Sequence, residues 1–175
     1  MNRWWRLFRH RWMDPGDSRR AVPDDMAERL AARVRASEAR HTGEVRLLVE
    51  AGLPTSYVLR VHNDAALAAV VRERALAWFG RLRLWDTEHN NGVLIYLLLA
   101  ENAIEFVADR GLARHVPPSA WQAIVDRLGT RLRAGEVEDG LTQALEEVSA
   151  LLVMHCPAGP GVPAHNELPD EVLRV

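Results

Sequence analysis

The sequence predicts a three-layer α/β/α sandwich around a mixed sheet of about four strands. The first observation is the segment Val93–Leu99, an unbroken apolar run of the kind found in strands covered on both faces. The second is the order of the predicted elements along the chain, which is helix, strand, helix, strand, strand, strand, helix, helix. Helices that precede, interrupt and follow the strands can cover both faces of one sheet.

Residues 1–13 predict a short helix with Trp4, Phe8 and Trp12 at spacing i, i+4, i+8 on one face and arginines on the others. This pattern is typical of a helix that lies on an anionic membrane surface, and equally of an arm that packs on its own domain or on a partner. Because the helix is short, we expect only weak peripheral membrane contact. Asp14–Asp17 predicts a linker. The sequence contains no run of 18 apolar residues, so no transmembrane segment is predicted.

The first main helix is predicted from Pro23 to about His41, because Pro is favoured in a first turn and apolar residues follow at helical spacing. A strand is expected at Val45–Val49. The next helix begins near Asp64 and ends near Phe79. We expect Val45–Val49 and Val93–Leu99 to run parallel, joined by a right-handed crossover through that helix.

Leu82–Trp85 is predicted as a short strand. Val93–Leu99 and Ile104–Ala108 are predicted as an antiparallel hairpin, closed by the polar pair Glu101-Asn102. Two helices then follow, from about Pro117 to Gly135 and from about Val137 to Met154.

The tail from Pro157 is rich in Pro and Gly and predicts little structure of its own, although residues 166–171 are candidates for docking in extended form. The predicted division is therefore an arm and linker at 1–22, one domain at 23–155 and a tail at 156–175.

Composition narrows the class of protein. The chain has 175 residues and a formal net charge of −2, which argues against general nucleic-acid binding. A single cysteine, Cys156, excludes an internal disulfide and a cysteine-based zinc site, and fits a reducing cytoplasm. We therefore predict a cytoplasmic protein.

The hairpin predicts a polar rim at one end of the sheet. An antiparallel return places the turn before the first strand beside the turn after the second, and the crossover adds the end of the first main helix. The predicted rim residues are Glu38, His41, Glu44, Asp86, Thr87, Glu88, Asn90, Asn91, Asp109 and Arg110. Carboxylate and amide oxygens are the ligands of hard cations such as Ca²⁺ or Mg²⁺. Turn chemistry alone also explains Asn90-Asn91-Gly92, since Asn tolerates positive φ and Gly permits close backbone approach.

Two segments carry a family resemblance, Asn90-Asn91-Gly92-Val93-Leu94-Ile95 and Asp109-Arg110-Gly111-Leu112-Ala113. They resemble the TPM domain family, often called phosphatase-like, and the resemblance extends over roughly Pro23 to His155. It looks closest to a cytoplasmic subgroup with recurrent WDTE-x-NNGVLIY and ADRG motifs. The resemblance implies the sandwich fold. It also implies metal ligands at the positions of Asn90 and Ala113, where the family has Asp and Glu.

These two departures predict a degenerate metal site, because Asn90 keeps only a neutral oxygen and Ala113 offers none. Asp109 replaces a family Gly and supplies a carboxylate. The candidate metal ligands are Asn90, Asp109, Glu38, Asp86 and Glu88.

Three functions follow. The leading prediction is a cytoplasmic binding or assembly module for an unidentified protein partner, with a membrane-associated protein as one candidate. The alternative is a divalent-metal-assisted phosphatase. In that case the cation polarises the phosphate, Arg110 holds its oxygens, and Asp109 or His41 handles the proton. A calcium-responsive adaptor that uses the same rim without chemistry is a third interpretation.

Overall fold

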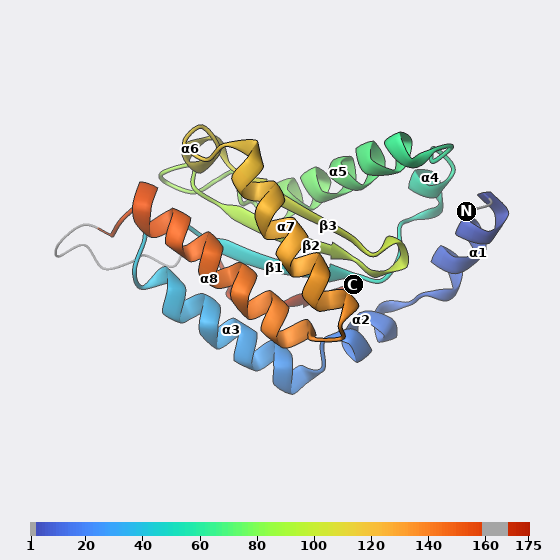
Figure 1. Cartoon of the computed structure of the whole chain (residues 1–175), viewed down its shortest axis with the longest axis horizontal. Coiled ribbons are helices and arrows are strands. Elements are labelled where there is room, and N and C mark those ends of the chain that lie inside the picture. The colour runs from blue at the N-terminus through green and yellow to red at the C-terminus, as the bar shows by residue number, and fades with distance from the viewer. Residues whose placement is uncertain (1–2, 159–167) are drawn as a thin grey trace.

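The computed structural model describes residues 3–158 and 168–175. In this part of the chain, one four-stranded mixed sheet lies between two layers of helices (Figure 1), so the predicted fold class is confirmed. The strands are β1 (Val45–Glu50), β2 (Val93–Leu98), β3 (Ala103–Ala108) and β4 (Leu173–Arg174).

The helices differ widely in length. The longer ones are α1 (Arg3–Trp12), α3 (Asp24–Glu38), α5 (Asp64–Arg81), α7 (Pro118–Arg133) and α8 (Val137–His155). The shorter ones are α2 (Pro15–Ala21), α4 (Thr55–Val58), the 3-10 helix η1 (Leu99–Glu101) and α6 (Arg110–Ala113). The segment predicted as a linker thus contains α2, where Asp14 caps the helix by accepting a hydrogen bond from the Gly16 amide.

The sheet has the order β3-β2-β1-β4. β1 runs parallel to β2, with Val45 opposite Val93, and β2 pairs antiparallel with β3, with Leu94 opposite Val107. The parallel pair and the hairpin are therefore confirmed. All six residues of β1 and all six of β2 are buried, as expected for strands covered on both faces.

The prediction of a strand at Leu82–Trp85 is wrong. The chain turns back on the end of α5 there: the amides of Arg83 and Leu84 bond to the carbonyls of Gly80 and Phe79, and Arg83 has a φ of 58°. Leu84 is fully buried, which accounts for the strand-like alternation of apolar and polar residues. An isolated buried side chain in a turn produces the same short pattern as a strand.

The fourth strand comes instead from the tail. β4 lies parallel to the edge of β1, and the Val175 amide donates to the Val49 carbonyl at 3.0 Å. The expected docking segment 166–171 lies partly outside the described residues. Its described end contacts β1 through Arg46, whose guanidinium donates to the Pro169 carbonyl.

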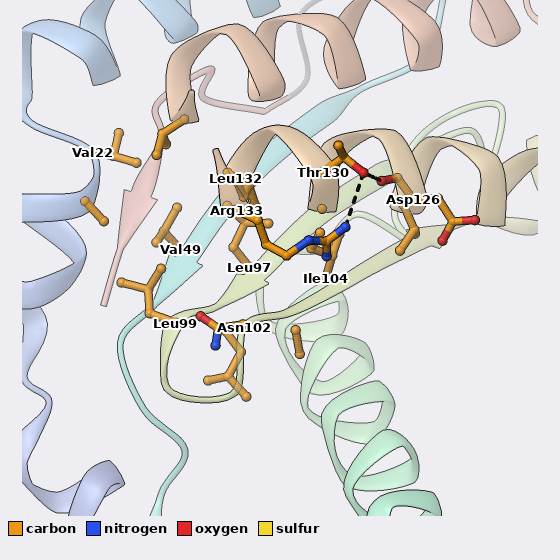
Figure 2. Close-up of a pocket in the computed structure, with 16 residues that line it drawn as sticks. Val22, Val49, Leu97, Leu99, Asn102, Ile104, Asp126, Thr130, Leu132 and Arg133 are labelled. Atoms are coloured by element: carbon orange, nitrogen blue, oxygen red, sulfur yellow. Dashed lines mark hydrogen bonds between the residues drawn. The ribbon is translucent and has the colours of Figure 1, made fainter. Parts of the chain in front are cut away.

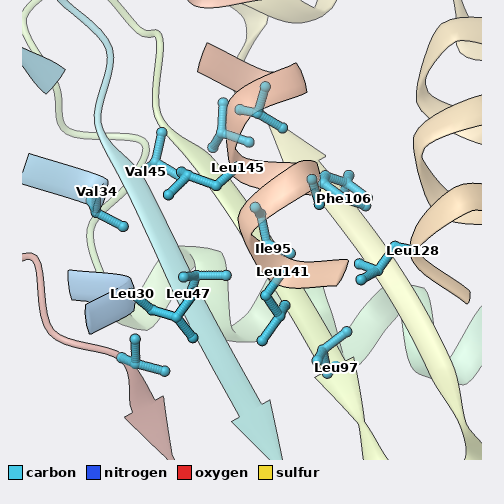
Figure 3. Packing of buried hydrophobic residues seen from close by; sticks show 14 of the residues in the cluster. Leu30, Val34, Val45, Leu47, Ile95, Leu97, Phe106, Leu128, Leu141 and Leu145 are labelled. Carbon is cyan, nitrogen blue, oxygen red and sulfur yellow. The ribbon is translucent and has the colours of Figure 1, made fainter. Parts of the chain in front are cut away.

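Two apolar clusters fill the sandwich. On one face, side chains such as Leu47 and Ile95 pack against α3, α7 and α8, where they meet Leu30 and Leu141 (Figure 3). On the other face, residues of β1, β2 and β3 pack against α5. Burial of each large apolar side chain stabilises the folded state by roughly 1.5–3 kcal/mol. The two clusters therefore hold the sheet between its helices, and the sheet fixes the positions of the turns at both of its ends.

Candidate functional site

Three turns meet at the end of the sheet where β1 and β2 begin. The Gly111 amide donates to the Asn90 carbonyl at 2.7 Å, and the Asp109 amide donates to the Gly92 carbonyl at 2.9 Å. On the other side, the Val93 amide donates to the Glu44 carbonyl at 2.8 Å. The predicted meeting of these turns is therefore observed, and we call residues 41–44, 86–92 and 109–111 the rim.

Two glycines allow the rim turns to approach this closely. A Cβ at Gly92 would lie 2.2 Å from the Leu84 carbonyl oxygen, and a Cβ at Gly111 would lie 2.3 Å from the Asn90 carbonyl oxygen. Asn90 itself has a φ of 53°, in the left-handed region that Asn tolerates better than most residues. The turn chemistry expected for Asn90-Asn91-Gly92 is therefore present.

Arg110 places a positive charge on the rim. Its Nη2 and Nε donate to Asn90 Oδ1 at 2.9 and 3.2 Å. Asp109 caps α6, with its Oδ1 accepting from the Arg110 amide at 2.7 Å. Its Oδ2 is buried and has no hydrogen-bond partner within the described part of the chain. Asn90, Asp109 and Arg110 are thus the predicted site residues that the fold brings together.

Asn91 ties two turns of the rim to each other and was not among the predicted ligands. Its Nδ2 donates to the carbonyl and the hydroxyl oxygen of Thr42, both at 2.9 Å, and its amide donates to Thr87 Oγ1 at 3.2 Å. Asn91 Oδ1 is buried without a hydrogen-bond partner among residues 3–158 and 168–175. The sequence placed Asn91 in a turn at the rim, but it could not show that the side chain is buried against Thr42.

Glu38 and His41 are buried and bonded within the protein. Glu38 Oε1 accepts from the Val45 amide at 2.9 Å, and burial raises the pKa of Glu38 to about 9, with Glu44 and Asp170 adding to the shift. His41 bonds to Ser37 Oγ at 2.9 Å, and burial lowers its pKa to about 4. Both side chains are therefore neutral at pH 7.

The remaining predicted ligands lie on the surface. Asp86 pairs with Arg83 in the turn after α5, and Glu88 is exposed. In the part of the chain that the structure describes, no group of three or more His, Cys, Asp or Glu side chains is placed to hold a metal ion.

A model of the TPM domain matches residues 17–151. The chain belongs to the TPM domain family. This TPM protein also resembles the NMR structure of the BA42 protein from the psychrophilic bacterium Bizionia argentinensis, with a TM-score of 0.71 and 21% identity, over 87% of this chain and 94% of that one. At that identity the likeness shows the fold alone. No curated protein matches the chain.

Outside the matched span, α1 of this TPM protein is held by its polar face. Glu101, at the end of η1, has its Oε1 at 2.8 Å from both Arg6 Nε and His10 Nε2. His10 Nδ1 accepts the Leu53 amide at 2.9 Å. Burial alone would raise the pKa of Glu101, but the His10 hydrogen bond and the Arg6 charge lower it overall. Sequence reasoning missed these three residues, although Arg6 and His10 share the i, i+4 spacing of one helix face.

The opposite face of α1 is aromatic and points outward. Trp5, Phe8 and Trp12 are 58%, 52% and 74% exposed, and their rings stack with centroids 6.2 and 5.2 Å apart. The predicted face contained Trp4, whose side chain lies outside the described residues; Trp5 belongs to the observed face. We call Trp5, Phe8 and Trp12 the aromatic face. Among the described residues no helix is long and apolar enough to cross a membrane.

Proposed function

We propose that this TPM protein is a non-catalytic binding module of the cytoplasm that docks the aromatic face of α1 on an anionic membrane surface, where it meets a membrane-associated protein partner. The observation that carries the proposal is the orientation of α1. Its polar residues Arg6 and His10 are buried against Glu101, while three large aromatic side chains face water. The single cysteine supports the compartment.

This orientation is the reverse of that expected for a helix whose only task is to cover the domain. Burying a polar or charged group costs free energy unless it is compensated, and Glu101 forms an ion pair with Arg6 and a hydrogen bond with His10. Leaving the aromatic rings in water forgoes the stabilisation that their burial would give. An exposed aromatic face with arginines on the same helix, here Arg9 and Arg11, is typical of helices that lie at an anionic lipid interface.

The rim supports the non-catalytic part of the proposal. Asn90 Oδ1, the atom at the family's ligand position, already accepts hydrogen bonds from the Arg110 guanidinium. A divalent cation there would face a fixed positive charge, and like charges at such short range repel strongly. The rim residues are instead hydrogen-bonded mainly to each other, which suits a structural role in holding the turns together.

The membrane part is tested by sedimentation with vesicles. Wild-type protein should bind phosphatidylglycerol vesicles more tightly than phosphatidylcholine vesicles, and added salt should weaken the binding. Trp5→Ala/Phe8→Ala/Trp12→Ala should abolish it without changing stability by more than about 0.5 kcal/mol per site, since all three side chains are exposed. Leu59→Ala/Leu76→Ala is the matched control, because both leucines are also exposed. Equal binding by wild type and the aromatic variant at low salt rejects the docking face.

The alternative function, a divalent-metal-assisted phosphatase, is favoured by one observation. Asp109 Oδ2 and Asn91 Oδ1 are both buried without hydrogen-bond partners in the described residues, and free oxygens are what a hard cation takes. Thermal unfolding with Ca²⁺, Mg²⁺ or phosphate tests it, together with hydrolysis of p-nitrophenyl phosphate. A ligand at one hundred times its dissociation constant should stabilise the protein by about 2.7 kcal/mol. Metal-dependent turnover lost in Asp109→Asn would reject the non-catalytic proposal.

A further inference from the structure

The core is open at the end of the sheet opposite the rim, where β1 and β2 finish. A pocket of about 580 Å³ lies there between α2, α7 and the β2–β3 turn (Figure 2). Its apolar lining includes Val22, Val49, Leu97, Leu99, Ile104 and Val125. Val22, Val49 and Leu97 belong to the buried core, whereas the other three are only partly covered. The volume falls in the range of roughly 300–1,000 Å³ typical of small-molecule sites.

Arg133 lies at the edge of this pocket without a carboxylate partner in the described part of the chain. Its only hydrogen bond there is from Nη2 to Thr130 Oγ1, at 3.2 Å (Figure 2). Two other arginines of α7 are paired, Arg127 with Glu147 and Arg131 with Glu136. A free guanidinium next to an apolar pocket is suited to an anionic group, for which it offers a planar pair of donors.

Gly129 brings this guanidinium against the pocket wall. A Cβ at position 129 would lie 3.3 Å from Arg133 Nη1 and 3.5 Å from Ile104 Cδ1, so the charged group and the apolar wall meet at that point. Asp126, which also lines the pocket, accepts a hydrogen bond from Gln122 Nε2 at 2.9 Å. Its negative charge disfavours a ligand with several anionic groups, so one guanidinium suits one singly charged head.

The geometry points to a binding site for a single-chain aliphatic carboxylate, with the hydrocarbon chain in the pocket and the carboxylate on Arg133. The exposed Asn102 on the β2–β3 turn, at a φ of 49°, lines the same pocket. Such an amphiphile is available either free in water or from a lipid bilayer, and both sources present the same chemistry to the site. This inference is independent of the docking of α1.

The test is calorimetric titration of the full chain with decanoate, octanoate and decanol, all as monomers. Decanoate should bind about tenfold or more tightly than decanol, because a charge-assisted bidentate pair favours the carboxylate. Octanoate should bind about tenfold more weakly than decanoate, since two fewer methylenes are buried. Arg133→Gln should reduce decanoate affinity about tenfold and leave decanol affinity unchanged. Arg131→Gln, on the same helix, is the matched control and should bind like wild type.

A second variant tests the pocket itself. Val137→Trp places a large ring at a partly buried position of the lining and should block decanoate and decanol alike, with thermal unfolding used to show that the variant is folded. The aromatic variant of α1 should bind decanoate like wild type, so failure of membrane docking and failure of this site are distinguishable.

An experiment with vesicles distinguishes the two sources of the ligand, free amphiphile in water and a lipid bilayer. Binding of monomeric decanoate shows the free amphiphile as a ligand, whereas Arg133-dependent binding only to decanoate-containing phosphatidylcholine vesicles shows the bilayer as the source. The proposal would be overturned if wild-type protein bound decanoate and decanol with equal affinity. It would also be overturned if neither monomer binding nor vesicle binding changed in Arg133→Gln and Val137→Trp.

Discussion

The two ends of the central sheet differ in how closely the surrounding turns and helices pack. At the rim, backbone amides, Asn90, Asn91 and Arg110 bond mainly to one another, and glycines allow the turns to touch. At the opposite end the core is open, Arg133 has no carboxylate partner among the described residues, and α1 turns aromatic rings outward. Dense motifs can therefore mark close packing, while an open core and an outward aromatic face mark the places where a ligand or surface gains free energy on binding.

The largest expected effect compares two side chains on the same face of β2. Ile95→Ala should lower the free energy of unfolding by about 4 kcal/mol, because Ile95 is fully buried in the packed part of the core. Leu97→Ala should cost only about 2 kcal/mol, since Leu97 already borders the open pocket and loses fewer contacts. Urea denaturation of both variants measures the difference. An equal or larger loss for Leu97→Ala would mean that the pocket is closed in solution.

The next effect concerns the close approach at the rim. Gly111→Ala should destabilise the protein by about 3 kcal/mol, because the new Cβ would press on the carbonyl oxygens of His89 and Asn90, which belong to the backbone. Gly80→Ala is the matched control: nothing lies within 4 Å of its Cβ position in α5, and Ala favours the helix by up to about 1 kcal/mol. Thermal unfolding compares the two, and a small loss for Gly111→Ala would show that the turns can separate.

The sequence was sufficient for the sandwich, the β2–β3 hairpin and the meeting of the rim turns, because long apolar runs and antiparallel connectivity leave few alternatives. It was not sufficient for β4. Two residues at the chain end carry no periodic pattern, and their pairing with β1 depends on an edge that is visible only in three dimensions.

The candidate site shows the same limit. The hairpin connectivity placed Asn90, Asp109 and Arg110 together, but it did not predict the hydrogen bonds that Arg110 donates to Asn90. Neither the burial of Arg6 and His10 on Glu101 nor the free guanidinium of Arg133 follows from spacing, because each depends on contacts between distant segments. The metal, catalytic and partner roles assigned to these residues stay predictions.

A third effect is a pH dependence at the rim end, where Glu38 lies under β1. Because burial raises the pKa of Glu38 to about 9, the folded state holds a proton that the unfolded state releases above about pH 4.5. Stability should therefore fall as pH rises from 6 to 8, by roughly 2 kcal/mol from this group. Glu38→Gln should remove most of that slope, whereas Glu88→Gln, at an exposed position, should keep it. Unfolding curves measured across this pH range give the dependence of stability on pH for each variant. An unchanged pH dependence in Glu38→Gln would contradict the raised pKa of Glu38.

The smallest effect tests whether the rim residues only hold the turns together or bind a cation. If Arg110 already supplies the positive charge at the rim, Asn90→Asp creates an ion pair with it and should stabilise the protein by about 0.2–1 kcal/mol, because the pair is partly exposed. High salt should reduce that gain. Calcium should add nothing further, because the new carboxylate is engaged by the guanidinium. If instead the rim holds a divalent cation, the added charge should increase the calcium-dependent stabilisation. Thermal unfolding of both forms with and without calcium distinguishes the two, and the variant Asn90→Asp/Arg110→Ala shows whether removal of the guanidinium is what allows calcium to bind.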